Sequence, residues 1–555
     1  ASQCDIYMDA SSPFALLHSP LLLLTLLVPI FVSFLLFLTE KPGPSRSNGG
    51  ARLPPSPWGI PVLGHLPLLG SLPHRKLRSL AEAHGPVMLL RLGGVPTVVA
   101  SSADTALEVM KTHDLAFASR PAVRMAERLL YGRDMAFAPY GQYWRQARRV
   151  CVLHLLSARR VASFRRVREQ EAGALVDRVR RAACSSRPEG NVVNLTDELI
   201  SYTSSVISRA AFGDEGGYGI DDDLTEVFAV FEELLGTATV GEFVPWLAWV
   251  DTLMGLDAKV ARARKVMDGL LERVISDHRQ RRLSGGRRLV GDGEDDHRDF
   301  VDVLLDVSED DGEDSGGVRF DTVGIKAIIL DMFAAATDTT YTTLTWAVAE
   351  LINNPSEMHK LQDEVRAAVN GAGHVTEDHL EKMSYLRAVI RETLRLHAPL
   401  PLLLPRETLE DTELLGYRVP ARTRVVINAW AIGRDPATWE RAEEFVPARF
   451  ADGPAEYVLG QDFRFVPFGA GRRGCPGVGF AVPSIDLALA SLLYHFDWEL
   501  PAAAAGAKLD MSELYGLSVR LKATLHLVAK PWTRGLLELH LPLWTRLWDC
   551  LKKQK

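Results

Sequence analysis

The 555-residue chain has few cysteines and no strong excess of either charge. Its cysteines are widely spaced and form no Cys-x-x-Cys pair; they are Cys4, Cys151, Cys184, Cys475 and Cys550. This spacing argues against a structural zinc site and against a disulfide framework. The net charge of −7 is mild for this length, and it gives no indication of nucleic-acid binding. We therefore expect a reduced, cytosol-facing domain.

Long apolar runs are also scarce, with one exception near the start of the chain. The run Leu21–Leu38, LLLLTLLVPIFVSFLLFL, carries no charge and reaches the lower length limit of a membrane-spanning helix. Basic residues follow it, namely Lys41, Arg46 and Arg52, and the positive-inside rule then places the rest of the chain in the cytosol. A cleaved signal peptide is the alternative, but its apolar run would be shorter and would follow a basic start.

One cysteine stands in a glycine-rich stretch, FGAGRRGCPG, at Phe468–Gly477. Glycines allow the backbone to fold tightly and to bring N–H groups close to the sulfur of Cys475. Such N–H groups tune a metal-bound thiolate, and Arg473 can reach the anionic edge of a cofactor. The alternative is a buried cysteine in a glycine-rich loop that binds nothing.

This stretch resembles the cysteine loop of the cytochrome P-450 family, the haem-thiolate monooxygenases. The five fixed positions of the family are filled, by Phe468, Gly471, Arg473, Cys475 and Gly477. The resemblance implies that Cys475 is the axial ligand of the haem iron. A thiolate in that position favours cleavage of the O–O bond.

The resemblance covers roughly Pro54–Trp532 and implies the cytochrome P-450 fold, which is mainly α with a small β region. The stretch PPSPWGIP at Pro54–Pro61 resembles the proline hinge of plant-type microsomal members. We divide the chain into a lumenal N-terminus (1–20), a transmembrane anchor (21–38), a linker with the proline hinge (39–61), the monooxygenase domain (62–532) and an atypical C-terminal extension (533–555). For the extension, an interfacial amphipathic helix and a segment without a role stay open.

Two further stretches resemble motifs that bind the haem propionates. Trp144 and Arg148 are four residues apart in a helical pattern, so they lie on one face, and both can donate to a carboxylate. Arg406, which follows Pro405, resembles another propionate contact of the family. Without the cysteine loop, Trp144 and Arg148 would be interpreted as an ordinary surface pair.

An apolar-periodic segment at Asp321–Asn353 predicts one helix of roughly 50 Å. Its stretch AATDTT contains mediocre helix formers, an inconsistency that often marks function. The stretch resembles the oxygen-binding motif of the family, which implies that Thr339 is the alcohol and Asp338 the acid that deliver protons during oxygen activation. A string of threonines in a core helix is the alternative. Ala336 replaces the usual glycine, and we hypothesise that its methyl narrows the oxygen pocket and straightens the helix.

A second predicted helix carries Glu392 and Arg395, and a later loop carries Arg449. Glu and Arg three residues apart occur by chance in a chain rich in both. Their order and their distance from the cysteine loop resemble the Glu-x-x-Arg motif of the family, with Arg449 as the third member of a buried ionic triad. The family's acidic residue before this arginine is Ala448 here. We interpret the triad as structural support for the cysteine loop.

The remaining patterns predict local structure. Strands are expected at Val87–Leu92 and Thr97–Ala100, with a glycine turn between them, and a helix at Val482–Tyr494. Residues 281–315 are a low-complexity region whose acidic run predicts a solvated loop. By resemblance, apolar substrate contacts come from the loop around Met125–Pro139, from Ala334 and Ala335, from Pro401–Leu404 and from Leu514–Leu517.

The resemblance implies an enzyme that binds haem b and inserts one oxygen atom from O2 into a small hydrophobic molecule, such as a specialised metabolite. Electrons would come from NADPH through a membrane-bound flavoprotein reductase. The protein would be a single-pass protein of the endoplasmic reticulum with a cytosolic catalytic domain. A haem-thiolate isomerase or dehydratase is an alternative, although Asp338 and Thr339 speak against it. A non-catalytic, membrane-tethered protein that binds haem or sterol is another.

Overall fold

The structure, a computed structural model, describes residues 52–184, 192–213, 222–286, 298–309, 321–453, 459–504 and 506–532, together with Val28. Apart from Val28, the predicted membrane anchor lies outside the described residues. So do the predicted C-terminal extension and most of the acidic run after residue 309.

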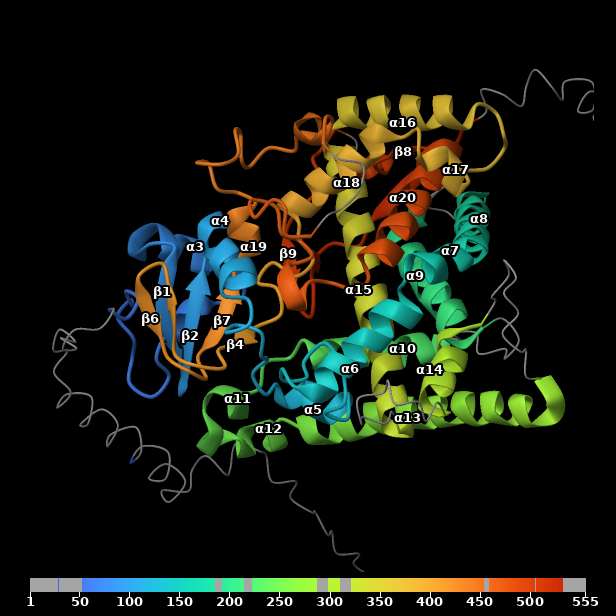
Figure 1. Cartoon of the computed structure of the whole chain (residues 1–555). Helices are drawn as coiled ribbons and strands as arrows, with labels where there is room; N and C mark the ends of the chain where they lie inside the picture. Colours follow the sequence, from blue (N-terminus) through green and yellow to red (C-terminus); the bar gives the residue numbers. More distant parts are fainter. Residues whose placement is uncertain are drawn as a thin grey trace, which may run out of the picture.

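A small β region lies on one side of the molecule and a larger helical body on the other (Figure 1). The β region is a four-stranded sheet in the order β1-β2-β7-β4. Its strands are β1 (Val87–Leu92), β2 (Val95–Ala100), β7 (Arg424–Ile427) and β4 (Arg406–Glu407). β2 pairs in parallel with β7, so the sheet joins the early chain to the segment before the cysteine loop. Arg406 thereby acquires a fixed position at the edge of this sheet.

The two predicted strands are confirmed, and the second begins at Val95 instead of Thr97. They are antiparallel, and the apolar side chains of VMLLRL are mostly buried in β1. The turn needs glycine because Gly93 has φ of 59° and because a Cβ there would lie 2.2 Å from the carbonyl oxygen of Phe243.

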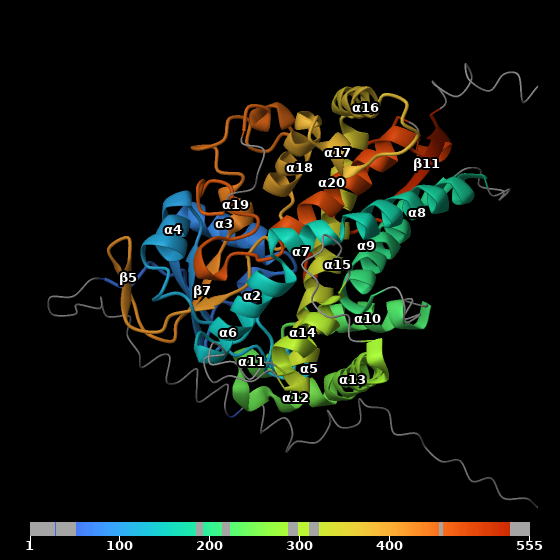
Figure 2. The ribbon, with the colours of Figure 1, turned by 45° about the vertical axis from the view of Figure 1, so that its right-hand side comes forward.

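The predicted long helix is confirmed as α15 (Thr322–Asn353), which has 32 residues and is α-helical throughout. Asp321 caps it, because its side chain accepts a hydrogen bond from the backbone N–H of Gly324. Figures 1 and 2 show α15 running through the helical body. It packs against α9 (Leu195–Phe212), α18 (Ser384–Leu396) and α20 (Val478–His495), so it is buried over most of its length.

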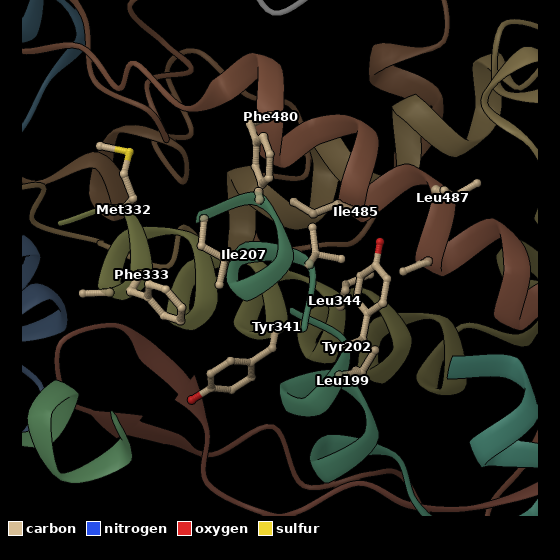
Figure 3. Close-up of a cluster of buried hydrophobic side chains, with 14 of the residues drawn as sticks. Leu199, Tyr202, Ile207, Met332, Phe333, Tyr341, Leu344, Phe480, Ile485 and Leu487 are labelled. Atoms are coloured by element: carbon tan, nitrogen blue, oxygen red, sulfur yellow. The ribbon is translucent and has the colours of Figure 1, made fainter. Parts of the chain in front are cut away.

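The centre of the helical body is an apolar cluster between α9, α15 and α20 (Figure 3). Phe333 of α15 stacks on Phe212 of α9 with a ring-centroid distance of 5.0 Å. Tyr202 of α9 is buried, and its hydroxyl donates to the carbonyl oxygen of Ser484 at 2.8 Å. This packing fixes α20, and with it the cysteine loop that precedes α20, relative to α15.

Other helices cover this centre: α5 (Arg124–Leu129), α6 (Gln142–Val150), α8 (Arg165–Cys184), α10 (Asp222–Leu235), α13 (Leu256–Arg281), α14 (Phe300–Glu309) and α16 (Pro355–Val369). The helix α3 (Pro73–His84) packs instead against β1 and α19 (Ala429–Ile432). The described part also contains a three-stranded sheet and two hairpins. The sheet has the order β3 (Val192–Asn194), β11 (His526–Pro531), β8 (Phe496–Glu499); the hairpins are β5 (Thr412–Leu414) with β6 (Tyr417–Val419), and β9 (Glu513–Tyr515) with β10 (Val519–Leu521).

The prediction of a low-complexity region at residues 281–315 is wrong in part. The helix α14 lies inside this range, and Phe300, Val301, Leu304 and Leu305 are buried against the core. Their spacing is that of one helix face, but the acidic and glycine-rich neighbours obscure it in the sequence.

Among the described residues, one helix, α20, is long and apolar enough to cross a membrane. It is also 67% buried inside the protein over that window, which is typical of a core helix. The predicted anchor at 21–38 therefore stays a prediction. The predicted fold, mainly helical with a small β region, is confirmed by the elements described above.

Candidate active site

The cysteine loop holds Cys475 directly before the N-terminus of α20. Its backbone N–H donates to the carbonyl oxygen of Phe468 at 2.9 Å. Burial raises the pKa of the Cys475 thiol, whereas hydrogen bonds from the backbone of Gly477 and Val478 and the charge of Arg148 lower it. Backbone N–H groups at a helix N-terminus favour a thiolate, so this position suits a sulfur that binds a metal.

Gly471 of the cysteine loop allows the loop to lie close to the segment that contains Met110 and Asp114. Gly471 has φ of 67°, and a Cβ there would lie 2.2 Å from the carbonyl oxygen of Met110. Asp114 then binds the loop from the same side. It accepts from the backbone N–H of Arg472 at 3.1 Å and pairs with the guanidinium groups of Arg472 at 2.7 Å and of Arg406 at 3.3 Å.

Four arginines gather around the loop, and all are largely buried: Arg120, Arg148, Arg406 and Arg473. Their hydrogen-bond partners are mainly backbone carbonyls. Arg148 donates to Gly474 at 2.7 Å, and Arg473 donates to Ala118 and Ala138, both at 2.7 Å. Burial, followed by the charges of Arg406 and Arg148, lowers the pKa of Arg473 to about 9.

The carbonyl oxygens accept hydrogen bonds from these guanidinium groups but do not neutralise their positive charges. Asp114 is the carboxylate paired with Arg406, and Asp134 lies close enough to raise the pKa of Arg120 and of Arg473. A cluster of this kind is suited to a ligand with acidic groups, because such a ligand supplies the missing negative charge. The donor set therefore fits haem, which combines an iron that takes a thiolate with two propionates.

The structure brings the predicted residues Trp144, Arg148, Arg406 and Arg473 together in this cluster. The Arg473 guanidinium lies 4.2 Å from the ring centroid of Trp144. The indole N–H of Trp144 donates to the carbonyl oxygen of Met135 at 3.2 Å. Arg120 was missed by the sequence reasoning, because a lone arginine before a proline offers no spacing signal.

Part of the predicted oxygen-binding motif on α15 is accessible to solvent. Ala335 is exposed and Ala336 and Thr339 are half-buried, although their helical neighbours Thr337 and Asp338 are buried. The hydroxyl of Thr339 donates to the carbonyl oxygen of Ala335 at 2.6 Å. The hydroxyl thus has a partner inside the helix, one that it can exchange for another acceptor.

Asp338 is buried, with 3% of the residue exposed. Burial raises its pKa, whereas hydrogen bonding to Ser518 and the charge of Arg520 lower it. Its Oδ2 atom is buried and has no hydrogen-bond partner among the described residues. A carboxyl of this kind, one residue from Thr339, is chemically able to take up and release a proton.

Met135 connects the two halves of the site. Its backbone N–H donates to Asp331 of α15 at 2.5 Å, and its carbonyl oxygen accepts from Arg473 at 3.3 Å and from Trp144. The backbone near Met135 therefore links the cysteine loop to α15.

A mostly apolar cavity of about 180 Å³ lies between the hairpin β9–β10 and the segment before β4. Its lining contains much of the predicted substrate-contact set, namely Phe137, Pro401–Leu404 and Tyr515–Leu517. Ala334 and Ala335 are not part of this lining, and Met125 lies in the helix α5 rather than in a loop. A larger cleft of about 370 Å³, between α16 and strands β8 and β11, contains no predicted site residue.

The predicted ionic triad is assembled in the structure. Glu392 and Arg395 are both buried, and the Nε and Nη2 atoms of Arg395 donate to the two carboxylate oxygens at 2.7 and 2.8 Å. Arg449 donates to the same carboxylate at 3.0 Å. Arg395 also donates to the carbonyl oxygens of Gly433 and Ala442, both at 2.6 Å. The triad thus fastens the segment between β7 and the cysteine loop onto α18.

We expect Glu392→Gln to destabilise the fold by about 3–5 kcal/mol, because it leaves two arginine charges without their carboxylate. Thermal unfolding followed by circular dichroism measures the loss. The exposed Glu444, whose side chain pairs with Arg441 at 3.5 Å, provides the control, and Glu444→Gln is expected to leave the unfolding temperature unchanged. Equal unfolding temperatures for the two variants would contradict the structural role of the triad.

Comparisons with known proteins agree with this geometry. The sequence pattern of the family described as "Cytochrome P450" matches residues 54–524. The chain is 48% identical over 470 residues to "Cytochrome P450 71A1" of Persea americana, which covers 84% of this chain and 91% of the relative. It is 44% identical over 498 residues to "Norfluorocurarine oxidase" of Strychnos sp, which covers 89% of this chain and 95% of the relative.

Solved structures show the same fold. A zebra fish cytochrome P-450 with abiraterone superposes with a TM-score of 0.67 at 24% identity, covering 83% of this chain and 100% of that chain. At this identity the likeness speaks for the fold alone. The match to the family over most of the chain, together with the plant relatives, confirms the resemblance found in the cysteine loop. The protein belongs to the cytochrome P-450 family and is an oxidoreductase of the haem-thiolate monooxygenase class.

Proposed function

We propose that this enzyme inserts one oxygen atom from O2 into a small hydrophobic substrate, with electrons from NADPH supplied by a membrane-bound flavoprotein reductase. The observation that carries the proposal is the link through Met135. This link joins the arginine-flanked loop of Cys475 to the helix that carries Asp338 and Thr339. A thiolate position and a proton-handling pair are thus held together by one backbone segment.

The residues of the cysteine loop would hold haem b. Cys475 would be its axial ligand, and Trp144, Arg148, Arg406 and Arg473 would bind its propionates, with Arg120 beside them. Phe468, Gly471 and Gly477 would shape the loop, since Gly471 admits the close approach of Met110 and Gly477 caps α20. When bound, a haem with a thiolate ligand supplies the chemistry of oxygen activation.

Asp338 and Thr339 would handle the protons that oxygen activation consumes. The buried carboxyl of Asp338 takes a proton and passes it on, because burial keeps its pKa above that of a carboxyl in water. The hydroxyl of Thr339 exchanges its bond to Ala335 for a bond to an incoming water or oxygen atom. This pair speaks against an isomerase or dehydratase, which has no use for such protons.

A specialised metabolite is the substrate class that we propose. The lining of the cavity at β9–β10 is mostly apolar, as in pockets for small hydrophobic ligands. One relative is named as an oxidase of norfluorocurarine. We also propose that the apolar run at Leu21–Leu38 anchors the enzyme in the endoplasmic reticulum membrane with its catalytic domain in the cytosol.

Reconstitution with a plant NADPH-dependent reductase in lipid vesicles tests the proposal. Candidate substrates are first selected from a plant metabolite library by the shift that they cause in the haem spectrum. We expect NADPH and O2 to be consumed in the presence of such a substrate, and a product that carries one atom of labelled O2. Product without O2 consumption would favour the isomerase or dehydratase. Binding without any product would favour the non-catalytic alternative.

A further inference from the structure

The hairpin β9–β10 forms one wall of the apolar cavity, and neighbouring segments hold it from several sides (Figure 1). Its tip contributes Tyr515–Leu517 to the lining, and β10 contributes Val519. On the side of α15, the indole N–H of Trp346 donates to the carbonyl oxygen of Val519 at 3.0 Å. Just after α10, Gly236 lies so close that a Cβ there would be 2.3 Å from the backbone nitrogen of Leu517. The position of the tip thus affects the width of the cavity.

The helix α3 holds the strand β9 through one carboxylate, that of Glu513. Its Oε2 atom lies 3.0 Å from Nε2 of His74 and accepts from Nε of Arg75 at 2.6 Å. The side chains of Glu513 and His74 are 3% and 0% exposed. Burial raises the pKa of Glu513, but the hydrogen bonds and charges of His74 and Arg75 lower it to about 2. The carboxylate is therefore ionised and can only accept, so Nε2 of His74 carries a proton.

His74 has a fixed position and reaches a second residue of β9. Its carbonyl oxygen accepts from the side-chain amide of Asn428 at 2.8 Å, and its ring meets the ring of Trp430 edge-on at 5.1 Å. The ring also lies nearly parallel to that of Tyr515, at a centroid distance of 6.4 Å. No residue of α3 belongs to the described lining of the cavity. We call His74, Arg75 and Glu513 the α3 clasp.

We propose that His74 and Arg75 are positioning residues for substrate selection: by binding Glu513 they fix the tip of the hairpin, so that the cavity accepts compact apolar molecules and excludes bulkier ones. The inference rests on the proposed function, in which this cavity receives the substrate. An apolar pocket discriminates by shape, so a wall that can shift loses selectivity. A clasp that served stability alone would leave the order of ligand preference unchanged.

Two variants of Glu513 differ in whether an acceptor oxygen remains in the clasp. The probes are N-butylimidazole and the bulkier N-tritylimidazole, whose ring nitrogen binds haem iron and whose substituent needs apolar space. Their Kd values are measured from the shift of the haem spectrum. In Glu513→Met, the affinity for the trityl probe relative to the butyl probe is expected to rise at least about tenfold. Glu513→Gln keeps an oxygen that accepts from both donors and is expected to restore the wild-type ratio.

A second variant acts on the other partner of the clasp. His74→Phe keeps a ring beside Tyr515 but removes the donor, and it is expected to raise the ratio as Glu513→Met does. If Glu513→Met does not fold, His74→Phe decides. The control is Asp411→Asn, which breaks an exposed ion pair with Arg418, 2.6 Å long, at the hairpin β5–β6. This hairpin does not line the cavity, so the ratio is expected to stay unchanged.

A measurement without any probe follows the hairpin itself. Hydrogen exchange of the backbone amides of Leu514–Leu517 is measured by mass spectrometry on the haem-loaded protein. Exchange is expected to be faster in Glu513→Met and in His74→Phe, because the tip is no longer fixed from the side of α3. Glu513→Gln and Asp411→Asn are expected to exchange at the wild-type rate.

A raised ratio with faster local exchange, and rescue by glutamine, support the proposal. An unchanged ratio in folded Glu513→Met or His74→Phe, or an equal loss of affinity for both probes, would overturn it. Neither measurement uses NADPH or O2. Failure of the proposed function is therefore distinguishable, because the wild-type protein would then form no product from O2 while the ratio still responds to the clasp.

Discussion

The variant Cys475→Ala is expected to lose the thiolate-type spectrum of the reduced, CO-bound protein completely. In the proposed site the sulfur of Cys475 is held at the N-terminus of α20 by its loop. Burial raises the pKa of this thiol, whereas backbone hydrogen bonds from Gly477 and Val478 lower it. No other described cysteine can take this role. Cys151 is buried at the C-terminal end of α6, where the helix carbonyl groups do not favour a thiolate, and Cys184 is exposed at the end of α8.

Cys151→Ala is the control for this experiment. It removes a buried thiol that is close enough to Arg148 to affect its pKa, but we assign it no ligand role. It is expected to keep the thiolate-type spectrum. The measurement is the difference spectrum of the reduced protein with and without CO, with folding checked by circular dichroism. A Cys475→Ala protein that keeps the spectrum would refute the ligand assignment.

Thr339→Ala is expected to separate NADPH consumption from product formation. Because the Thr339 hydroxyl donates to a carbonyl of its own helix, its removal leaves no buried donor without a partner and disturbs α15 little. Haem content is therefore expected to stay near normal, while product per NADPH falls at least about tenfold and peroxide rises. Product, NADPH and peroxide are measured in the same reconstituted assay at equal haem content.

Thr343→Ala is the matched control, because the Thr343 hydroxyl makes the same bond, to the carbonyl oxygen of Thr339, at 2.8 Å. Both variants lose one hydroxyl of one helix, but Thr343 is buried one turn farther along. We expect Thr343→Ala to keep the coupling of product to NADPH. Unchanged coupling in Thr339→Ala, or equal losses in both variants, would rule out a specific role of Thr339 in proton handling.

Several parts of the site were predictable because they depend on short stretches of sequence. Glycine at position 471 is required by a backbone with positive φ and by the close approach of Met110. The tight backbone of the loop was therefore predictable from its glycines. The helix α15 was predictable from its apolar period and its Asp321 cap. The spacing of Trp144 and Arg148 likewise placed them on one face of α6.

Other parts were hidden because their signal lies in contacts between distant segments. The helix α14 was missed because acidic and glycine-rich neighbours hide its apolar face. Arg120 joins the arginine cluster through bonds to the carbonyl oxygens of Leu404 and Pro405, far away in the chain. No local pattern in the sequence announces a contact of this kind.

The sequence by itself indicated the class of chemistry in this protein, because the glycine-rich cysteine loop and the helical Asp-Thr pair are short local patterns that resemble motifs of one family. Only the tertiary structure decided the electrostatics. The pKa values of Asp338 and of Arg473 depend on burial and on charged neighbours from other segments, such as Arg520 for the former and Arg406 for the latter. Coulomb energies fall with distance in space and rise as water is excluded, and neither quantity is written in the order of residues along the chain.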